Sequence, residues 1–394
     1  MAMVDDCRPL SAQRESEELG SVHDDRDGQR RRVVFAFRRR SRAARDGGTD
    51  TPGGRAGKTA RAAARDDGLA QPHGPHDAAA AQKLAQRLSA EGRHDDALGA
   101  YQNAQALYLR AGSEAEAARC AADRAGVLAA MDRFAEALVD YDAAQAVLAR
   151  LGCEADAARC VMNRAVALAN LGRFDDALAA YQEAEDALVL LGGEVDAARC
   201  TANRANVLAN LGRLPEAMAG YDAAQAVLER CGCEAETAAC LTNRAVALAA
   251  LGRSQDALAG FEEARAIYQR HGHESGQARC TVQRASTLAG LGRFGEAASL
   301  FEEAEAVYLR LGLDLEVARC KLGKADALRN LGRSAEALST YDEARSLYEQ
   351  RDQKIEAARC VMSRAKALSA LGRSAEARDD FAQARAVFAR FSQT

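Results

Sequence analysis

The fold of this chain is decided by the stretch ARCVMNRAVALANLGRFDDALAAYQEAEDALVLL, residues 158–191. Closely related stretches begin at Ala198 and again at Ala358. A fixed period of about 40 residues indicates a solenoid, in which each repeat buries its apolar side against its neighbours. The chain is therefore expected to grow by stacking rather than around one closed core.

Three positions recur at this period and define the repeat. They are a cysteine in the first half, an arginine after the loop glycine, and an aromatic residue in the second half. The cysteines are Cys120, Cys160, Cys200, Cys240, Cys280, Cys320 and Cys360; the arginines are Arg93, Arg133, Arg173, Arg213, Arg253, Arg293, Arg333 and Arg373; and the aromatic residues are Tyr101, Tyr141, Tyr181, Tyr221, Phe261, Phe301, Tyr341 and Phe381. The pattern predicts eight repeats, starting near residues 78, 118, 158, 198, 238, 278, 318 and 358.

Each repeat is predicted to form two antiparallel α-helices. In the third repeat the first helix spans about Glu154 to Leu171, because apolar residues recur there at helical spacing. Gly172 then supplies the left-handed residue that closes this helix. In the second helix, Tyr181 is expected to fill the gap that small alanines leave. For three of the second helices a serine is predicted as the N-cap, namely Ser254, Ser334 and Ser374.

Residues 1–77 have the composition of a disordered tail. They are rich in Arg, Gly and Asp and show no sustained helical or strand periodicity. The segment Arg30–Arg45, RRRVVFAFRRRSRAAR, carries eight arginines and no acid. A cluster like this can contact phosphates, an anionic membrane or an acidic partner, although a solvated tail is the simpler interpretation.

Composition limits the cellular compartment and the classes of partner that we expect. The net charge of −4 gives no strong attraction to nucleic acid. No apolar run is long enough for a transmembrane helix, and no signal peptide is visible. Seven of the eleven cysteines occupy equivalent positions of stacked repeats, which lie about 8–10 Å apart and so beyond the reach of a disulfide. We therefore expect reduced thiols in the core of a cytoplasmic protein.

The repeat resembles the tetratricopeptide repeat (TPR) across residues 78–394. The family's pattern of small residue, glycine, alanine, aromatic residue and alanine matches Ala165, Gly172, Ala177, Tyr181 and Ala184. The period is longer than is usual for this family, so the unit is similar to the arrays of kinesin light chains and Pins-type scaffolds. The resemblance implies an all-α fold, a right-handed α-α superhelix of about eight helix-turn-helix repeats. It also implies that the first helix of each repeat lines a concave groove.

On that geometry the concave face carries asparagines suited to a ligand. An asparagine amide both donates and accepts, which suits the backbone of an extended peptide. Asn203, Asn206 and Asn210 follow one another at i, i+3 and i+7, hence on one stripe. The peptide-binding residues that the resemblance implies are Arg159, Met162, Asn163, Val166 and Asn170 in the third repeat, Arg199, Asn203, Asn206 and Asn210 in the fourth, and Thr242, Asn243 and Val246 in the fifth.

Two arginine registers carry separate predictions. Arg164 stands where the family usually has an aliphatic residue, and a buried charge needs partners, so we expect this register to contact acids of adjacent helices. Arg159 is expected either to pair with a carboxylate of the ligand or, more simply, to pair with Asp156 three residues earlier. The equivalents of Arg164 are Arg124, Arg204, Arg244, Arg284, Lys324 and Arg364, and those of Arg159 are Arg119, Arg199, Arg279, Arg319 and Arg359.

No catalytic constellation and no cofactor are expected. None of the six histidines lies beside a plausible nucleophile and acid, and buried thiols are usually inert, so the chain is predicted not to be an enzyme. A weak zinc candidate is the set Cys231, Cys233, His271 and His273, in the loops after two successive second helices. Because stacked repeats separate equivalent atoms by roughly 10 Å, no metal is assigned.

These observations predict a non-enzymatic scaffold or adaptor that binds a peptide or a helical segment of another protein. The alternative is a regulatory or nucleic-acid-associated protein, which uses residues 30–45 for contact and the repeats as a sensor. Terminal repeats normally need a polar outer face. Phe388 and Phe391 therefore suggest a weak homodimer through the C-terminal helix.

Overall fold

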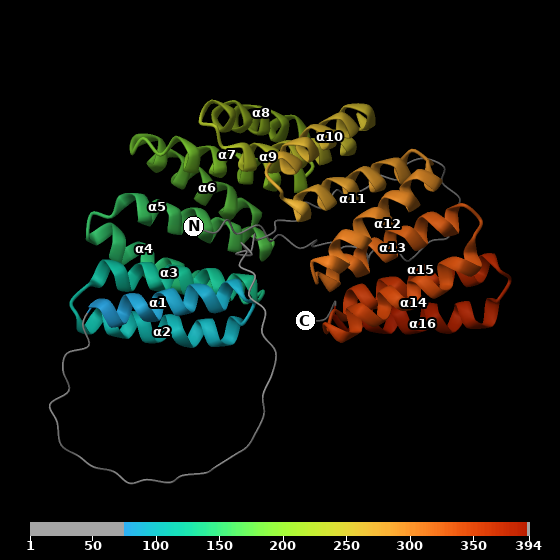
Figure 1. Ribbon diagram of the computed structural model, residues 1–394, viewed down its shortest axis with the longest axis horizontal. Coiled ribbons are helices and arrows are strands. Elements are labelled where there is room, and N and C mark those ends of the chain that lie inside the picture. The colour runs from blue at the N-terminus through green and yellow to red at the C-terminus, as the bar shows by residue number, and fades with distance from the viewer. Residues whose placement is uncertain (1–74, 392–394) are drawn as a thin grey trace, which may run out of the picture. The chain divides into compact units, whose positions relative to one another are not determined.

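The computed structural model describes residues 75–391, which form sixteen α-helices joined by short turns (Figure 1). These residues divide into two compact units, 75–191 and 192–391. The first unit contains α1 (Pro75–Ala90), α2 (His94–Arg110), α3 (Glu114–Ala130), α4 (Phe134–Arg150), α5 (Glu154–Asn170) and α6 (Phe174–Leu190). The second contains α7 (Glu194–Asn210), α8 (Leu214–Arg230), α9 (Glu234–Ala250), α10 (Ser254–Arg270), α11 (Glu274–Gly290), α12 (Phe294–Arg310), α13 (Asp314–Asn330), α14 (Ser334–Gln350), α15 (Lys354–Ala370) and α16 (Ser374–Phe391).

The prediction of paired helices at a fixed period is confirmed along the described range. The first helix begins at Pro75, three residues before the expected start at residue 78. The predicted disordered tail, including the basic segment Arg30–Arg45, lies outside the described residues apart from its last three positions. What the tail does stays a prediction.

Each helix ends in a tight turn that the sequence predicts. After α5, Gly172 adopts a φ of +74°, a left-handed conformation that favours glycine. The N–H of Gly172 donates to the carbonyl of Ala169 at 3.1 Å, and the N–H of Arg173 donates to that of Leu168 at 2.9 Å. Two turns depart from this pattern, because Asp132 and Asp352 occupy the glycine position with φ of 60° and 53°.

The predicted serine N-caps are wrong. Ser254, Ser334 and Ser374 are the first residues of their helices, and the N-cap is the preceding arginine. The side chain of this arginine does not cap the helix but pairs with the acid three residues on, as Arg173 Nε does with Asp176 at 2.7 Å. That acid lies in the first turn, where the helix dipole favours negative charge.

Small residues bring the helices close together, and one aromatic residue per repeat fills the space between them. Ala165, Ala177 and Ala184 have no exposed surface, and neither has Tyr181. The approach is close where α8 meets α7, because a Cβ added to Gly220 would lie 3.0 Å from the Cβ of Ala205. Replacing a buried aromatic of this kind by alanine is expected to destabilise the fold by about 3–5 kcal/mol.

The seven equivalent cysteines are core residues, as predicted. Each is at most 3% exposed, and all ten cysteines of the described range are thiols rather than disulfides. Burial raises the pKa of the thiol to about 12 at Cys120, Cys160, Cys240 and Cys360. These thiols therefore stay protonated near neutral pH and lack the reactivity of a thiolate.

Candidate functional site

The odd-numbered helices form the inner row of each unit. In the first unit α3 contacts α5, and in the second α7 contacts α9, α9 contacts α11, α11 contacts α13 and α13 contacts α15. Within 75–391 no two even-numbered helices of a unit contact each other to the same extent. The odd-numbered helices are thus more closely spaced, which places them on the inside of the curve within each unit. This is the arrangement that a concave face of first helices requires.

In the first unit, α5 carries five of the predicted binding residues, and they differ in their exposure. Met162 and Asn163 are half-buried, so part of each side chain meets solvent. Val166 is only 3% exposed and belongs to the core. The side chain of Asn170 donates to the backbone carbonyl of Val166 at 2.9 Å. Only the pair Met162 and Asn163 therefore offers an accessible surface without a local hydrogen-bonding role.

In the second unit, the predicted asparagine stripe on α7 is interrupted. Asn203 is half-buried and Asn210 is exposed, as expected for a binding face. Asn206 is only 1% exposed, and its Oδ1 accepts a hydrogen bond of 2.5 Å from the hydroxyl of Tyr221 on α8. The prediction that Asn206 faces a ligand is wrong, because its side chain is buried between α7 and α8 and bonded to Tyr221.

The next inner helix, α9, likewise carries both accessible and buried residues of the predicted site. Asn243 is half-buried at the register of Asn203. Thr242 and Val246 are 2% and 8% exposed and so belong to the core. The hydroxyl of Thr242 donates to the carbonyl of Ala238 at 2.7 Å. The accessible part of the predicted site in this unit is therefore Asn203, Asn210 and Asn243.

Arginines at the position of Arg159 pair with acidic residues of this chain in several repeats. Asp156 accepts hydrogen bonds from Arg119 Nε at 2.7 Å and from Arg159. Burial alone would raise the pKa of Asp156, but these hydrogen bonds outweigh it and lower the pKa. In the second unit Arg199 pairs with Asp196 and with Glu236, the latter at 2.8 Å. The simpler of the two expectations, pairing with an acid three residues earlier, is confirmed, and these arginines also join successive inner helices.

Arg279 uses a different partner at this register. Its Nη2 donates to the hydroxyl of Tyr268 at 2.8 Å, and its guanidinium carbon lies 5.9 Å from the centre of the Tyr268 ring. Gly276 stands where neighbouring repeats have an acid, and a Cβ there would lie 2.7 Å from the ring. Glycine thus makes room for the tyrosine, whose hydroxyl replaces the missing carboxylate.

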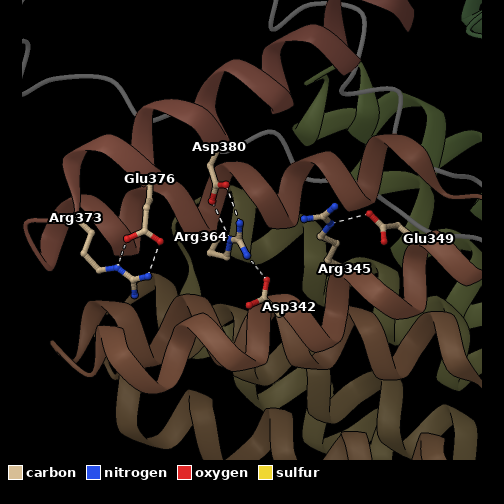
Figure 2. A network of polar contacts seen from close by, with 7 residues as sticks. All are labelled: Asp342, Arg345, Glu349, Arg364, Arg373, Glu376 and Asp380. Carbon is tan, nitrogen blue, oxygen red and sulfur yellow. Dashed lines mark hydrogen bonds and ion pairs between the residues drawn. The ribbon is translucent and has the colours of Figure 1, made fainter.

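The register of Arg164 forms ion-pair clamps between repeats, as predicted. Figure 2 shows the example of Arg364 on α15, which bonds both oxygens of Asp380 on α16, at 2.8 and 2.7 Å, and Asp342 on α14 at 2.5 Å. The hydrogen bonds to Asp380 raise the pKa of Arg364. The clamps to the preceding helix are Arg164 with Asp142 at 3.2 Å, Arg244 with Asp222 at 2.6 Å, Arg284 with Glu262 at 2.6 Å and Lys324 with Glu302 at 3.3 Å.

The zinc candidate is not formed. No group of three or more His, Cys, Asp or Glu side chains in the described range is placed to hold a metal ion. His271 instead contacts Glu234, and the ring of His273 packs edge-on against Tyr268 at 6.2 Å. The Sγ of Cys233 lies 3.8 Å from the carbonyl oxygen of Cys231. Each side chain has its own local contact, so the loops do not converge.

Family models identify the repeats directly. Models of the tetratricopeptide repeat match residues 197–270 and 236–310, and also 158–183, 318–343, 358–379 and 365–390. The chain belongs to the tetratricopeptide repeat family. No curated protein matches the sequence.

Solved structures share the fold at low sequence identity. The apo form of the quorum sensor NprR from B. thuringiensis is 13% identical with a TM-score of 0.61, covering 79% of this chain and 88% of that one. Aspartyl phosphate phosphatase F from Bacillus subtilis is 13% identical with a TM-score of 0.57, covering 79% and 89%. A putative kinesin light chain from Podosopora anserina is 19% identical with a TM-score of 0.43, covering 50% and 97%. At such identities a shared fold does not transfer a ligand or an activity.

None of the helices between residues 75 and 391 is both long and apolar enough to cross a membrane.

Proposed function

We propose that the chain is a non-enzymatic scaffold that binds a peptide or a helical segment of another protein along the inner row. The observation that carries this proposal is the pair Asn203 and Asn243. These half-buried amides occupy one register of two helices in contact, α7 and α9, and neither side chain bonds to another residue within 75–391. Each amide is left to donate to and accept from a ligand.

The spacing of the inner helices suits an extended peptide. Packed helices lie about 8–10 Å apart, and an extended chain rises about 3.3 Å per residue. One amide on each inner helix thus meets the peptide backbone about every third residue. In the first unit, Asn163 holds the same register beside the half-buried Met162, which adds an adaptable apolar contact.

Absence of catalysis is part of the proposal. Buried thiols with a raised pKa at Cys160 and its equivalents support it, since they are poor nucleophiles. One protein of similar fold is named a phosphatase, but the fold alone does not supply a site. Thiols at all ten described cysteines favour a reducing compartment such as the cytoplasm.

The proposal is tested with Asn203→Ala combined with Asn243→Ala in the full chain. A partner is isolated by affinity purification with the wild type, identified by mass spectrometry, purified and titrated by calorimetry. The double variant is expected to bind at least tenfold more weakly with an unchanged unfolding midpoint. Gln255→Ala is the control, because it removes an exposed amide from the even-numbered helix α10. Unchanged binding by the double variant would rule out the inner row.

Two further predictions lie beside this one. The alternative function through residues 30–45 concerns a segment outside the described residues. Binding that is lost when these residues are deleted, and that falls steeply with salt, would favour it. The homodimer through α16 also stays a prediction; Phe388 is half-buried and Phe391 is 40% exposed. A constant monomer mass in light scattering across micromolar concentrations would count against a dimer.

A further inference from the structure

The last position of the second helix in a repeat usually holds an arginine that reaches back to the first helix of the same repeat. There it pairs with the acid that begins that helix. The pairs are Arg150 with Glu114, Arg230 with Glu194 at 2.7 Å, Arg270 with Glu234 at 3.8 Å, and Arg310 with Glu274 at 2.9 Å. This ion pair links the C-terminus of the second helix to the N-terminus of the first.

The third repeat keeps the acid of this pair and lacks the arginine. Leu190 ends α6 in place of the arginine and is 87% exposed, more than any other large apolar residue of the described range. Its neighbours Val189 and Leu191 are 61% and 43% exposed. Glu154, which begins α5, is exposed and has no ion-pair partner within residues 75–391. We call these four residues the α6 tip.

The α6 tip works against the stability of the chain that carries it. α6 has no basic residue in its last turn, where a cation would interact favourably with the helix dipole. The exposed surface of these apolar side chains, largest at Leu190, gains nothing from the hydrophobic effect until something covers it. A local rule that is broken without a compensating contact inside the fold points to a function.

We infer that the α6 tip is a docking surface for a protein partner that presents an apolar pocket flanked by a lysine or arginine. Leu190 projects from the helix end and enters the pocket, while Val189 and Leu191 cover its edge. The carboxylate of Glu154 pairs with the partner's cation, since no residue of the described range does so. The surface lies on an even-numbered helix, so this inference does not rest on ligand binding along the inner row.

The partner is found and measured in two steps. A photoreactive amino acid in place of Val189 of the full chain is irradiated in a lysate of the source cells, and cross-linked proteins are identified. The cross-linked protein is then purified and titrated by calorimetry against the wild type and three variants. These are Leu190→Arg, Glu154→Gln and the control Val139→Arg, which changes an exposed valine of α4. Leu190→Arg is expected to keep the fold, because arginine occupies this position in neighbouring repeats.

The expected result is at least tenfold weaker binding by Leu190→Arg and binding within twofold of wild type by Val139→Arg. Glu154→Gln is expected to bind several-fold more weakly and with a smaller dependence on salt. Three outcomes overturn the inference: no cross-linked protein, a second copy of this chain as the cross-linked protein, or binding by Leu190→Arg within twofold of wild type. Normal partner binding by the Asn203 and Asn243 variants leaves the inference intact while contradicting the inner-row function.

Discussion

The hydroxyl of Tyr221 donates a 2.5 Å hydrogen bond to Oδ1 of Asn206, and the two side chains are 0% and 1% exposed. The seventh repeat has the same contact between Tyr341 and Asp326, at 2.6 Å. In both repeats a polar residue of the first helix satisfies a tyrosine hydroxyl of the second helix. A buried hydroxyl without such a partner would carry a desolvation cost.

Asn206→Ala is therefore expected to destabilise the fold rather than to weaken ligand binding. Removing the acceptor leaves the hydroxyl of Tyr221 buried without its partner, a loss of about 1–3 kcal/mol. The free energy of unfolding from urea titration measures it. Adding Tyr221→Phe removes the orphaned hydroxyl, so the double variant is expected to lose less than the sum of the two single losses. Wild-type stability of Asn206→Ala would show that this hydrogen bond contributes nothing.

Asp132→Gly is expected to stabilise the chain. Asp132 has a φ of 60° at a turn where other repeats have glycine, and this conformation is strained for a residue with a Cβ. Glycine relieves the strain but loses more conformational entropy on folding. The net increase in the free energy of unfolding is about 0.5–1 kcal/mol. Thermal unfolding checks the gain. The reverse change, Gly172→Asp, places the strain in another repeat and is expected to lower the midpoint.

Stability is expected to fall as the pH rises above about 9. The pKa of the Cys160 thiol is raised by burial to about 12 from an ordinary value of 9.0. Because the pKa is higher in the folded chain, the thiol's contribution to the free energy of unfolding is fully present below the unfolded pKa. This contribution is lost between pH 9 and 12, where only the unfolded thiol ionises. Each such thiol lowers the free energy of unfolding by about 1.4 kcal/mol per pH unit in this window. Cys160→Ala is expected to reduce the slope of unfolding free energy against pH, and an unchanged slope would contradict the assignment.

The two acids bound by Arg364 are expected to contribute unequally to the stability of the chain. The Asp380 side chain is 8% exposed, whereas that of Asp342 is 52% exposed. Arg364→Ala leaves the Asp380 carboxylate buried and unpaired, which is expected to destabilise the chain by about 3 kcal/mol. Asp342→Ala removes only a solvent-screened contact and is expected to change stability by about 0–1 kcal/mol. Chemical denaturation compares them, and equal losses would refute this ranking.

The sequence predicted the helices and turns because their signals are local. The register of Tyr181 holds an aromatic residue and those of the small alanines hold alanine in every period, and the register of Gly172 holds glycine in all periods but one. Each repeat therefore has nearly the same neighbours. The binding face was harder to predict because it depends on side-chain direction. Asn203 and Asn206 share a helical stripe in sequence, yet only Asn203 retains accessible surface.

The sequence marks Asn206 as unusual for its register, but it does not show that the side chain is buried. Asn206 and Asp326 are polar residues at a register that holds Val166 and Val246 in other repeats, and each stands at the same distance along the chain before a tyrosine of the second helix. Spacing of this kind does not distinguish a solvent-facing amide from one bonded to the next helix. Only the packing of α7 against α8 decides between them.

The clamps carry a consequence for how such a chain changes length. Lys324 pairs with Glu302, and Arg284 pairs with Glu262 in the same way one period earlier. Deleting residues 278–317 would set Lys324 beside Glu262, so this clamp would be restored at the new junction. Loss or duplication of a whole period accordingly keeps these clamps in register, whereas a deletion of any other length would misalign the clamp at the new junction.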